Sequence, residues 1–124
     1  MSVRDINNEK YFWLREETDF LKSAIENQIS MIGVCLGAQL LAHILGGNIE
    51  RLKDESKKEN KPELGWSEIS PIDEKSNEEI SLIMKEPLKV LHWHGDRIIL
   101  PPQAELLASS TRCREQLFLS LIHI

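Results

Sequence analysis

Long apolar runs are missing from this 124-residue chain, and so is any excess of basic residues. No run approaches the roughly 20 apolar residues that a membrane-spanning helix requires. Lys and Arg total 15 against 20 for Asp and Glu, which gives a formal net charge of −5. A phosphate backbone or an anionic membrane surface is bound by an excess of Lys and Arg. We therefore expect neither nucleic acid nor a membrane as a partner.

Cysteine is also scarce, and no targeting segment is evident. The two cysteines, Cys35 and Cys113, lie in different settings and form no disulfide framework. Residues 1–10 are polar and lack the apolar core of a signal peptide. Both features favour a reducing, cytoplasmic location. The hydrophobic content of 41% is still enough for one modest domain with its own core.

The first half of the sequence alternates helix-like and strand-like segments. Residues 9–27 repeat apolar side chains at helical spacing, with charged residues on the other face. Residues 29–34 have the length and β-branched content of a buried parallel strand. Residues 36–45 have a second helical stripe, and the following Gly46 and Gly47 predict a left-handed cap. Helix, strand and helix in succession predict an α/β fold with a parallel sheet.

The second half changes to short strands separated by turns and prolines, with no internal repeat or Gly/Ser linker. Gly95 and Asp96 form a turn between two of the predicted strands. The charged residues 53–61 are typical of a solvated surface loop. Residues 78–84 have the composition of one or two helical turns. The predicted strands are residues 48–52, 65–70, 89–94, 97–100 and 106–110.

The most informative pattern surrounds Cys35, where the predicted strand ends and the second predicted helix begins. Gly33 and Gly37 flank it, two residues away on either side. A nucleophile elbow favours this spacing, because a side chain at either flanking position would collide with neighbouring backbone on so sharp a turn. Unpaired N–H groups at the helix start point toward the sulfur and favour its thiolate form. The Leu36 N–H is placed to donate to a developing oxyanion.

The same pentapeptide also fits a small buried cysteine that only packs. Three further features favour catalysis. Gln39 lies one helical turn after Cys35 and faces the same rim, and the paired glycines end the helix tightly. The third feature is the segment His-Trp-His-Gly-Asp at residues 92–96, which lies at the end of a predicted strand.

Residues 33–47, GVCLGAQLLAHILGG, resemble the nucleophile segment of class I glutamine amidotransferases. The likeness continues with ELGW at 63–66, HWHGD at 92–96, LASS at 107–110, and then Cys113, Gln116 and Phe118. Several independent motifs thus follow the order of stand-alone proteins similar to the glutaminase half of GMP synthetase. The resemblance implies a flavodoxin-like parallel sheet with helices on both faces, present here only in part.

The resemblance also implies a role for individual residues and for the bound molecule. Cys35 would attack the side-chain amide of glutamine, ammonia would leave, and a thioester would be hydrolysed. The Leu36 N–H would be half of the oxyanion hole, and Gln39 would contact glutamine. Ammonia would pass to an acceptor or a synthetase partner, and no cofactor is expected. The pocket for the α-amino and α-carboxylate groups would be lined by Trp93, His94, Gly95 and Asp96.

The two histidines of residues 92–96 also allow other interpretations. His92 and His94 are spaced to be two metal ligands on one face of a strand, but no third ligand group is evident at matching spacing. We therefore expect no metal, and a structural or substrate-lining role for both. His43 is expected to be packed or solvated. Cys113 lacks flanking glycines and is expected to pack.

The sequence departs from the family pattern at both ends. The opening strand and the Gly-Gly-Pro-like loop that donates the second oxyanion N–H are not found before residue 2, and no His-Pro-Glu segment follows Gln116. His123 is followed by Ile124, so no acid orients it as a base. We expect a partial amidotransferase domain at residues 1–118 and an aberrant tail at 119–124. Without its base, Cys35 is expected to be a poor catalyst, and an unpaired sheet edge would lower stability.

Two alternatives remain from the sequence. The chain is either a non-catalytic remnant that binds a glutamine-like ligand or a partner, or another cysteine hydrolase of a related fold. Ammonia release from glutamine distinguishes the first alternative from an enzyme.

Overall fold

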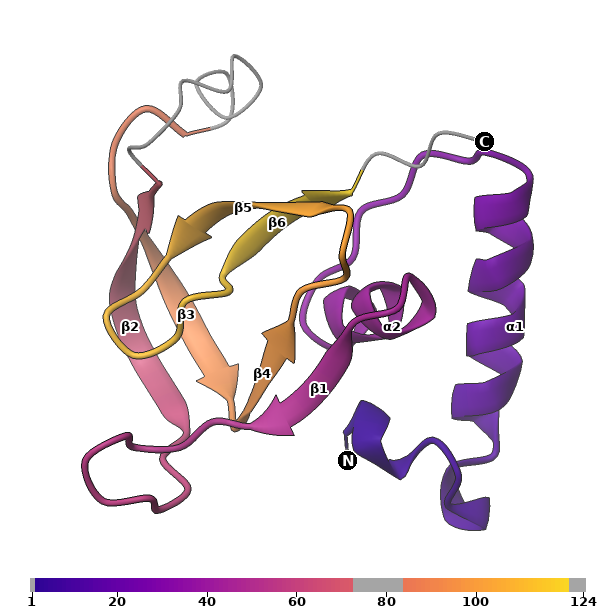
Figure 1. Cartoon of the computed structure of the whole chain (residues 1–124), viewed down its shortest axis with the longest axis horizontal. Coiled ribbons are helices and arrows are strands. Elements are labelled where there is room, and N and C mark those ends of the chain that lie inside the picture. The colour runs from indigo at the N-terminus through magenta and orange to yellow at the C-terminus, as the bar shows by residue number, and fades with distance from the viewer. Residues whose placement is uncertain (1, 73–83, 121–124) are drawn as a thin grey trace.

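The computed structural model describes residues 2–72 and 84–120 as an α/β arrangement (Figure 1). None of the described helices combines the length and the apolar content that crossing a bilayer requires. The elements in chain order are the 3-10 helices η1 (Val3–Asp5) and η2 (Glu9–Tyr11), the helices α1 (Trp13–Glu26) and α2 (Leu36–Ile44), and the strands β1 (Asn48–Arg51), β2 (Glu63–Pro71), β3 (Leu88–His94), β4 (Asp96–Ile99), β5 (Ala104–Ser109) and β6 (Leu117–Ser120).

Both predicted helices are confirmed, because the apolar spacing that predicted them also supplies their buried faces. In α1 the buried side chains include Leu14 and Thr18, and the Thr18 hydroxyl donates to the Leu14 carbonyl at 2.7 Å. After α2, Gly46 has a φ of +97° and the Gly47 N–H donates to the Ala42 carbonyl at 2.8 Å. The predicted left-handed cap is therefore present.

The strands form two antiparallel groups. β1 pairs with β4 in a two-stranded ribbon, and the other four form a sheet in the order β3-β2-β5-β6. The five strands predicted for the second half are confirmed. The sequence interpretation missed β6, which pairs with β5 and continues past residue 118 into the segment expected to be an aberrant tail. Among the described residues every ladder is antiparallel, so the predicted parallel pairing is not found there.

The predicted strand at residues 29–34 is wrong for the described structure. No ladder includes these residues, and the exposed fractions of Ile32 and Val34 are 95% and 78%. A strand exists only where a neighbouring strand accepts and donates its hydrogen bonds, and no described segment lies beside this one. Local β propensity is therefore insufficient here.

The larger hydrophobic core lies where α2 meets α1 and the β1–β4 ribbon. Figure 1 shows α2 between α1 and the strands, and α2 contacts α1, β1, β4 and η1. Leu14 and Leu40 have no exposed surface, and a second, smaller cluster forms under β2 and β5. The larger core consists of Val3, Leu14, Leu40, Ala42, Ile49 and Ile98.

Two further expectations concern loops. Residues 53–61 form the predicted surface loop, closed by a bridge between Lys53 and Asn60 and by a 3.1 Å contact between Lys61 Nζ and Asp54 Oδ2. Hydrogen bonds from Ser56 and Lys61 hold the pKa of the Asp54 carboxyl well below its usual range. The helical turns expected at residues 78–84 lie outside the described residues, apart from Met84.

The core predicts a clear contrast between two apolar side chains. Leu40→Ala removes a side chain with no exposed surface, so we expect a loss of about 2–5 kcal/mol in the free energy of unfolding. Phe20→Ala changes a side chain that is 71% exposed and should stay within about 0.5 kcal/mol of wild type. Urea unfolding followed by circular dichroism measures both. Equal losses in the two variants would contradict the placement of α2 at the centre of the core.

Candidate functional site

Cys35 lies directly before the first residue of α2, in a strained backbone conformation. It has φ 54° and ψ −113°, in the positive-φ region that side chains other than glycine rarely adopt. Such a conformation costs on the order of 1–3 kcal/mol and is concentrated at functional sites. The thiol is exposed. The residue singled out from the sequence therefore lies on a sharp turn into a helix, with its sulfur accessible.

The start of α2 leaves a backbone donor available next to Cys35. The Gln39 N–H donates to the Cys35 carbonyl at 3.2 Å, and the Gly37 N–H donates to the Val34 carbonyl at 3.0 Å. Among the described residues, the Leu36 N–H has no backbone acceptor. A free N–H directly after a nucleophile is the group that an oxyanion requires.

The two glycines that flank Cys35 differ in what surrounds them. A Cβ at Gly33 would lie 2.7 Å from Leu41 Cδ1 and 2.8 Å from the Ala38 nitrogen, so only glycine fits there. A Cβ at Gly37 would meet no atom within 4 Å. The predicted steric collision is therefore present at Gly33 and absent at Gly37, because Gly37 already belongs to the helix and its Cβ direction is open.

Gln39 places an unpaired acceptor one turn after the thiol. Its Oε1 is buried and has no hydrogen-bond partner among the described residues. A buried amide oxygen without a donor costs roughly 1–3 kcal/mol. A ligand amine or amide that donated to Oε1 would remove this cost.

A second cluster of polar side chains surrounds the buried carboxylate of Glu63, whose exposed fraction is 2%. Glu63 and His94 lie opposite each other in the β2–β3 register, and His94 Nε2 lies 3.0 Å from Glu63 Oε2. Ser110 Oγ donates to Oε1 at 2.7 Å, and Gln116 Nε2 donates to Oε2 at 2.8 Å. His92 Nδ1 lies 3.5 Å from Oε2. We call these five side chains the Glu63 cluster.

The Glu63 cluster corrects the expectation about metal ligands and gives a contact to two motif residues for which the sequence predicted no role. The sequence predicts no third ligand group for His92 and His94, but Glu63 supplies one from β2. Ser110 and Gln116 belong to the sequence motifs without a predicted role, and here both donate to Glu63. No local signal in the sequence indicated that these segments meet at one carboxylate, because the contacts span 31, 47 and 53 residues.

Residues 93–96 do not share one face. Successive residues of a strand point to opposite faces, so Trp93 lies on the outer side of β3 and is 77% exposed, whereas His94 points to Glu63. His94 Nδ1 lies 2.8 Å from the Asp96 carbonyl across Gly95. Arg4 donates to Asp96 Oδ1 at 3.0 Å through Nη2 and at 3.2 Å through Nε. The sequence interpretation missed this Arg4 contact.

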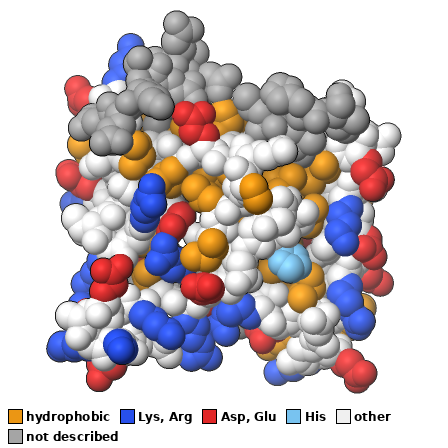
Figure 2. Space-filling view, viewed as in Figure 1, with side chains coloured by type: hydrophobic (Ala, Val, Ile, Leu, Met, Phe, Trp, Pro, Cys, Tyr) orange, Lys and Arg blue, Asp and Glu red, His pale blue; other side chains and the backbone are white. Residues whose placement is uncertain are grey.

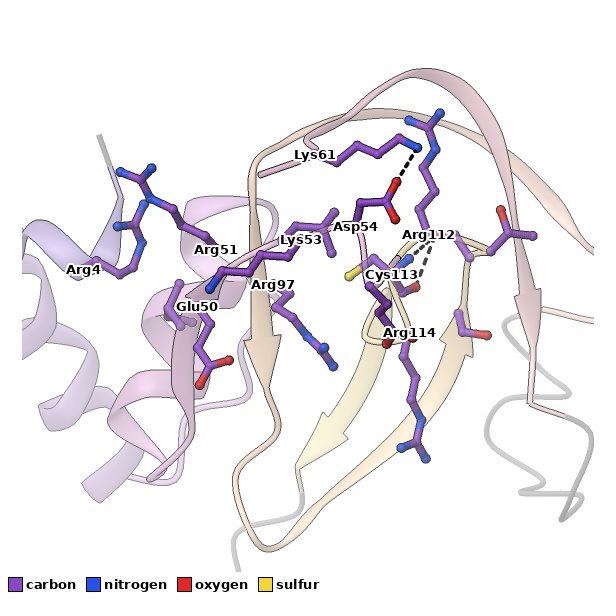
Figure 3. Close-up of a pocket in the computed structure, with 16 residues that line it drawn as sticks. Arg4, Glu50, Arg51, Lys53, Asp54, Lys61, Arg97, Arg112, Cys113 and Arg114 are labelled. Carbon is purple, nitrogen blue, oxygen red and sulfur yellow. Dashed lines mark hydrogen bonds and ion pairs between the residues drawn. The ribbon is translucent and has the colours of Figure 1, made fainter. Parts of the chain in front are cut away.

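A cavity of about 1170 Å³ lies apart from Cys35, between β1, the loop after it and residues 109–114 (Figure 3). Its lining includes seven Lys or Arg side chains and three Asp or Glu side chains, although the whole chain is acidic. Figure 2 shows Lys and Arg side chains gathered along the lower edge of this face. Three of the seven are paired with acids, in Arg4–Asp96, Lys61–Asp54 and Arg97–Glu115. Cys35, Gln39 and Trp93 do not line this cavity.

The second cysteine, Cys113, is 3% exposed, as expected for a packing role. Burial raises the pKa of its thiol to about 11, and the nearby carboxylates of Glu115 and Glu63 act in the same direction. The Glu115 carboxylate also hydrogen-bonds Arg97 and raises the pKa of that guanidinium. The two thiols therefore differ in access, and the buried one resists ionisation.

The family model for glutamine amidotransferase class-I matches residues 7–118. The chain belongs to this family. Amidotransferases with known structure have the same fold: one from Thermotoga maritima superposes with a TM-score of 0.76 at 29% identity, covering 90% of this chain and 45% of that one. Another, from Methylobacillus flagellatus, gives 0.77 at 25% identity over 97% of this chain and 43% of that one.

Two curated relatives show the same relationship. A subunit of the glutamine-hydrolyzing GMP synthase of Sulfolobus acidocaldarius is 33% identical over 99 residues, which are 79% of this chain and 46% of that protein. The putative glutamine amidotransferase-like protein YfeJ of Salmonella typhimurium is 30% identical over 107 residues, 86% of this chain and 42% of that protein. The chain thus spans less than half the length of these amidotransferases.

The environment of the two flanking glycines predicts opposite effects of the same substitution. Gly33→Ala forces a Cβ against Leu41 and the Ala38 backbone, so we expect a loss of about 1–3 kcal/mol in the free energy of unfolding. Gly37→Ala places a better helix former in α2, in open space, and should be neutral or stabilising by up to about 1 kcal/mol. Denaturant unfolding of the two variants measures the difference. A similar loss at both positions would contradict the close packing at Gly33.

The thiol environments predict selective alkylation of the native chain. With a pKa of about 11, Cys113 has on the order of 10⁻³ of its thiol ionised at pH 8, and its burial adds a steric barrier. We expect iodoacetamide to modify Cys35 at least about 100-fold faster, with Cys113 reacting only near pH 11 or in denaturant. Peptide mass spectrometry over time measures both sites. Comparable rates in the native chain at pH 8 would contradict the burial of Cys113.

Proposed function

We propose that Cys35 is the nucleophile of glutamine amide hydrolysis. One observation carries the proposal: an exposed thiol lies on a strained turn at the start of α2, beside a free backbone donor. Membership of the amidotransferase family supports the substrate class. The chemistry needs an accessible sulfur that faces the positive end of a helix, because the thiolate is the attacking species.

The proposed reaction forms and breaks one bond at the amide carbon of glutamine in each of two steps. The Cys35 sulfur attacks the carbon, and the carbonyl oxygen becomes an oxyanion that accepts from the Leu36 N–H. The carbon–nitrogen bond then breaks, and the nitrogen takes up a proton and leaves as ammonia. Water attacks the resulting γ-glutamyl thioester, which releases glutamate and restores the thiol.

Gln39 has the right position and chemistry for binding the substrate. Its buried Oε1 has no donor among the described residues, and it belongs to the helical turn that begins at Cys35. We propose that this oxygen accepts from a nitrogen of glutamine. Gly95 and Asp96 are proposed to bind the amino-acid end, as the family resemblance implies, with Asp96 held by Arg4. Trp93 and His94 keep the same proposed role with less support, because they point to opposite faces of β3.

Among the described residues, no histidine hydrogen-bonds the Cys35 thiol. His92 and His94 face Glu63, and His43 is exposed on α2. His123 lies outside the described residues. General-base activation typically contributes about 10²–10⁴-fold. We therefore expect slow turnover by this chain alone, and acylation of Cys35 is a better measure of its function than ammonia release.

The relatives suggest where ammonia goes. Some are named as subunits of a glutamine-hydrolyzing GMP synthase. By analogy we propose that ammonia passes to an acceptor on a synthetase partner, in the reducing cytoplasm. The alternative of a non-catalytic binding module is favoured by the lack of a described base. It predicts glutamine binding without any modification of Cys35.

An affinity label tests the proposed nucleophile. A diazoketone analogue of glutamine should alkylate Cys35 and leave Cys113 unmodified, and an excess of glutamine should slow the reaction at least about tenfold. Peptide mass spectrometry identifies the labelled site. Cys35→Ser is the matched control and should take up no label.

Modification by iodoacetamide needs no glutamine site. Comparing it with the diazoketone therefore distinguishes a formed glutamine pocket from a thiol that is only exposed. Labelling by the diazoketone that glutamine does not slow would count against the pocket. If iodoacetamide modified Cys35 and the diazoketone did not, the proposed function would be wrong for this chain.

A further inference from the structure

Three residues of the Glu63 cluster place metal-ligand atoms together in the interior. Glu63 and His92 are 2% and 3% exposed, and the side chain of His94 is 19% exposed. One ligand atom from each of the three lies within 4.8 Å of those of the other two. We propose that Glu63, His92 and His94 bind one divalent transition-metal ion, with Zn²⁺ as the first candidate.

The ligand set matches the chemistry of zinc. Two imidazole nitrogens and one carboxylate oxygen are ligands that Zn²⁺ binds at about 2.0–2.2 Å. Tetrahedral angles at such lengths put neighbouring ligand atoms roughly 3.3–3.5 Å apart. Glu63 Oε2 lies 3.0 Å from His94 Nε2 and 3.5 Å from His92 Nδ1, which brackets that separation. The ligand atoms of His92 and His94 lie within 4.8 Å of each other, so side-chain adjustment would bring all three ligands to one ion.

The residues around the proposed ligands already hold them in place. His94 Nδ1 donates to the Asp96 carbonyl at 2.8 Å, so Nε2 is the nitrogen that faces Glu63 and would coordinate an ion. Metal-ligating histidines usually have such a hydrogen bond on their second nitrogen. Ser110 and Gln116 bind the two oxygens of Glu63 and fix the plane of the carboxylate. His92 Nε2 is buried without a partner in the described structure, so no other contact orients this ring through that nitrogen.

Three protein ligands leave a fourth tetrahedral position for water or another group. His94 gives the site its contact with solvent, through which an ion can reach it. An ion here would join β2 to the end of β3, next to the Gly95 turn. The inference does not involve Cys35. It assigns His94 to the metal instead of the substrate pocket, and its test does not depend on amidase activity.

Calorimetric titration with Zn²⁺ tests the site. The titration uses the Cys35→Ser chain, which removes the exposed thiol as a competing ligand. We expect one ion per chain. His92→Ala and His94→Ala should each weaken binding at least about 100-fold, and Ser110→Ala about 10-fold, because it removes a positioning contact. His43→Ala is the matched control, since it removes an exposed histidine on α2, and it should bind as the parent does.

X-ray absorption of the zinc-loaded parent chain gives a measurement that does not depend on whether a variant folds. Nitrogen and oxygen neighbours with the scattering of two imidazole rings would support the site. Sulfur neighbours, an absence of binding, or binding that His92→Ala and His94→Ala leave unchanged while both remain folded by circular dichroism, would overturn it. The cluster would then be a hydrogen-bonded network of Glu63 with His94, Ser110 and Gln116.

Discussion

The buried carboxylate of Glu63 joins segments of the second half of this chain that lie 31 to 53 residues from it in the sequence. Moving a carboxylate out of water costs several kcal/mol unless donors replace the water. Here the donors come from His94 on β3, Ser110 after β5 and Gln116 before β6, while Glu63 begins β2. All four strands of the larger sheet therefore depend on one side chain. A one-residue slip of β3 against β2 would move His94 to the other face and remove its contact with the charge.

The contacts of Glu63 are connected to Cys35 through a short series of further contacts. His94 is bound to Glu63, and its other ring nitrogen holds the Asp96 carbonyl, so the turn at Gly95 is fixed. β4 begins at that turn, pairs with β1, and packs with it against α2. Cys35 stands at the first turn of α2. The Glu63 cluster thus fixes the strands that pack against α2, the helix at which the candidate site lies. Its own chemistry is separate from that of the Cys35 thiol.

How much the sequence predicted depends on the range of the interactions. The helices at residues 9–27 and 36–45 followed from local apolar spacing. The glycine spacing predicted the sharp turn at Cys35, although only Gly33 shows the expected steric collision. The partners of Glu63 and the pairing of Arg4 with Asp96 join distant segments, 92 residues apart in the second case, and no pattern indicated them. The strand predicted at residues 29–34 was wrong for the same reason, because a strand forms only where a neighbouring strand pairs with it.

The elbow illustrates why a local motif was sufficient for the site. The segment before Cys35 has no ladder partner among the described residues, so a sheet does not hold the strained φ of 54°. The helix side holds it instead. Gly33 packs against Leu41 and the Ala38 backbone at distances that exclude a Cβ, and Val34 accepts from the Gly37 N–H. Because every one of these contacts falls within residues 33–41, the local motif itself accounts for the backbone conformation at Cys35.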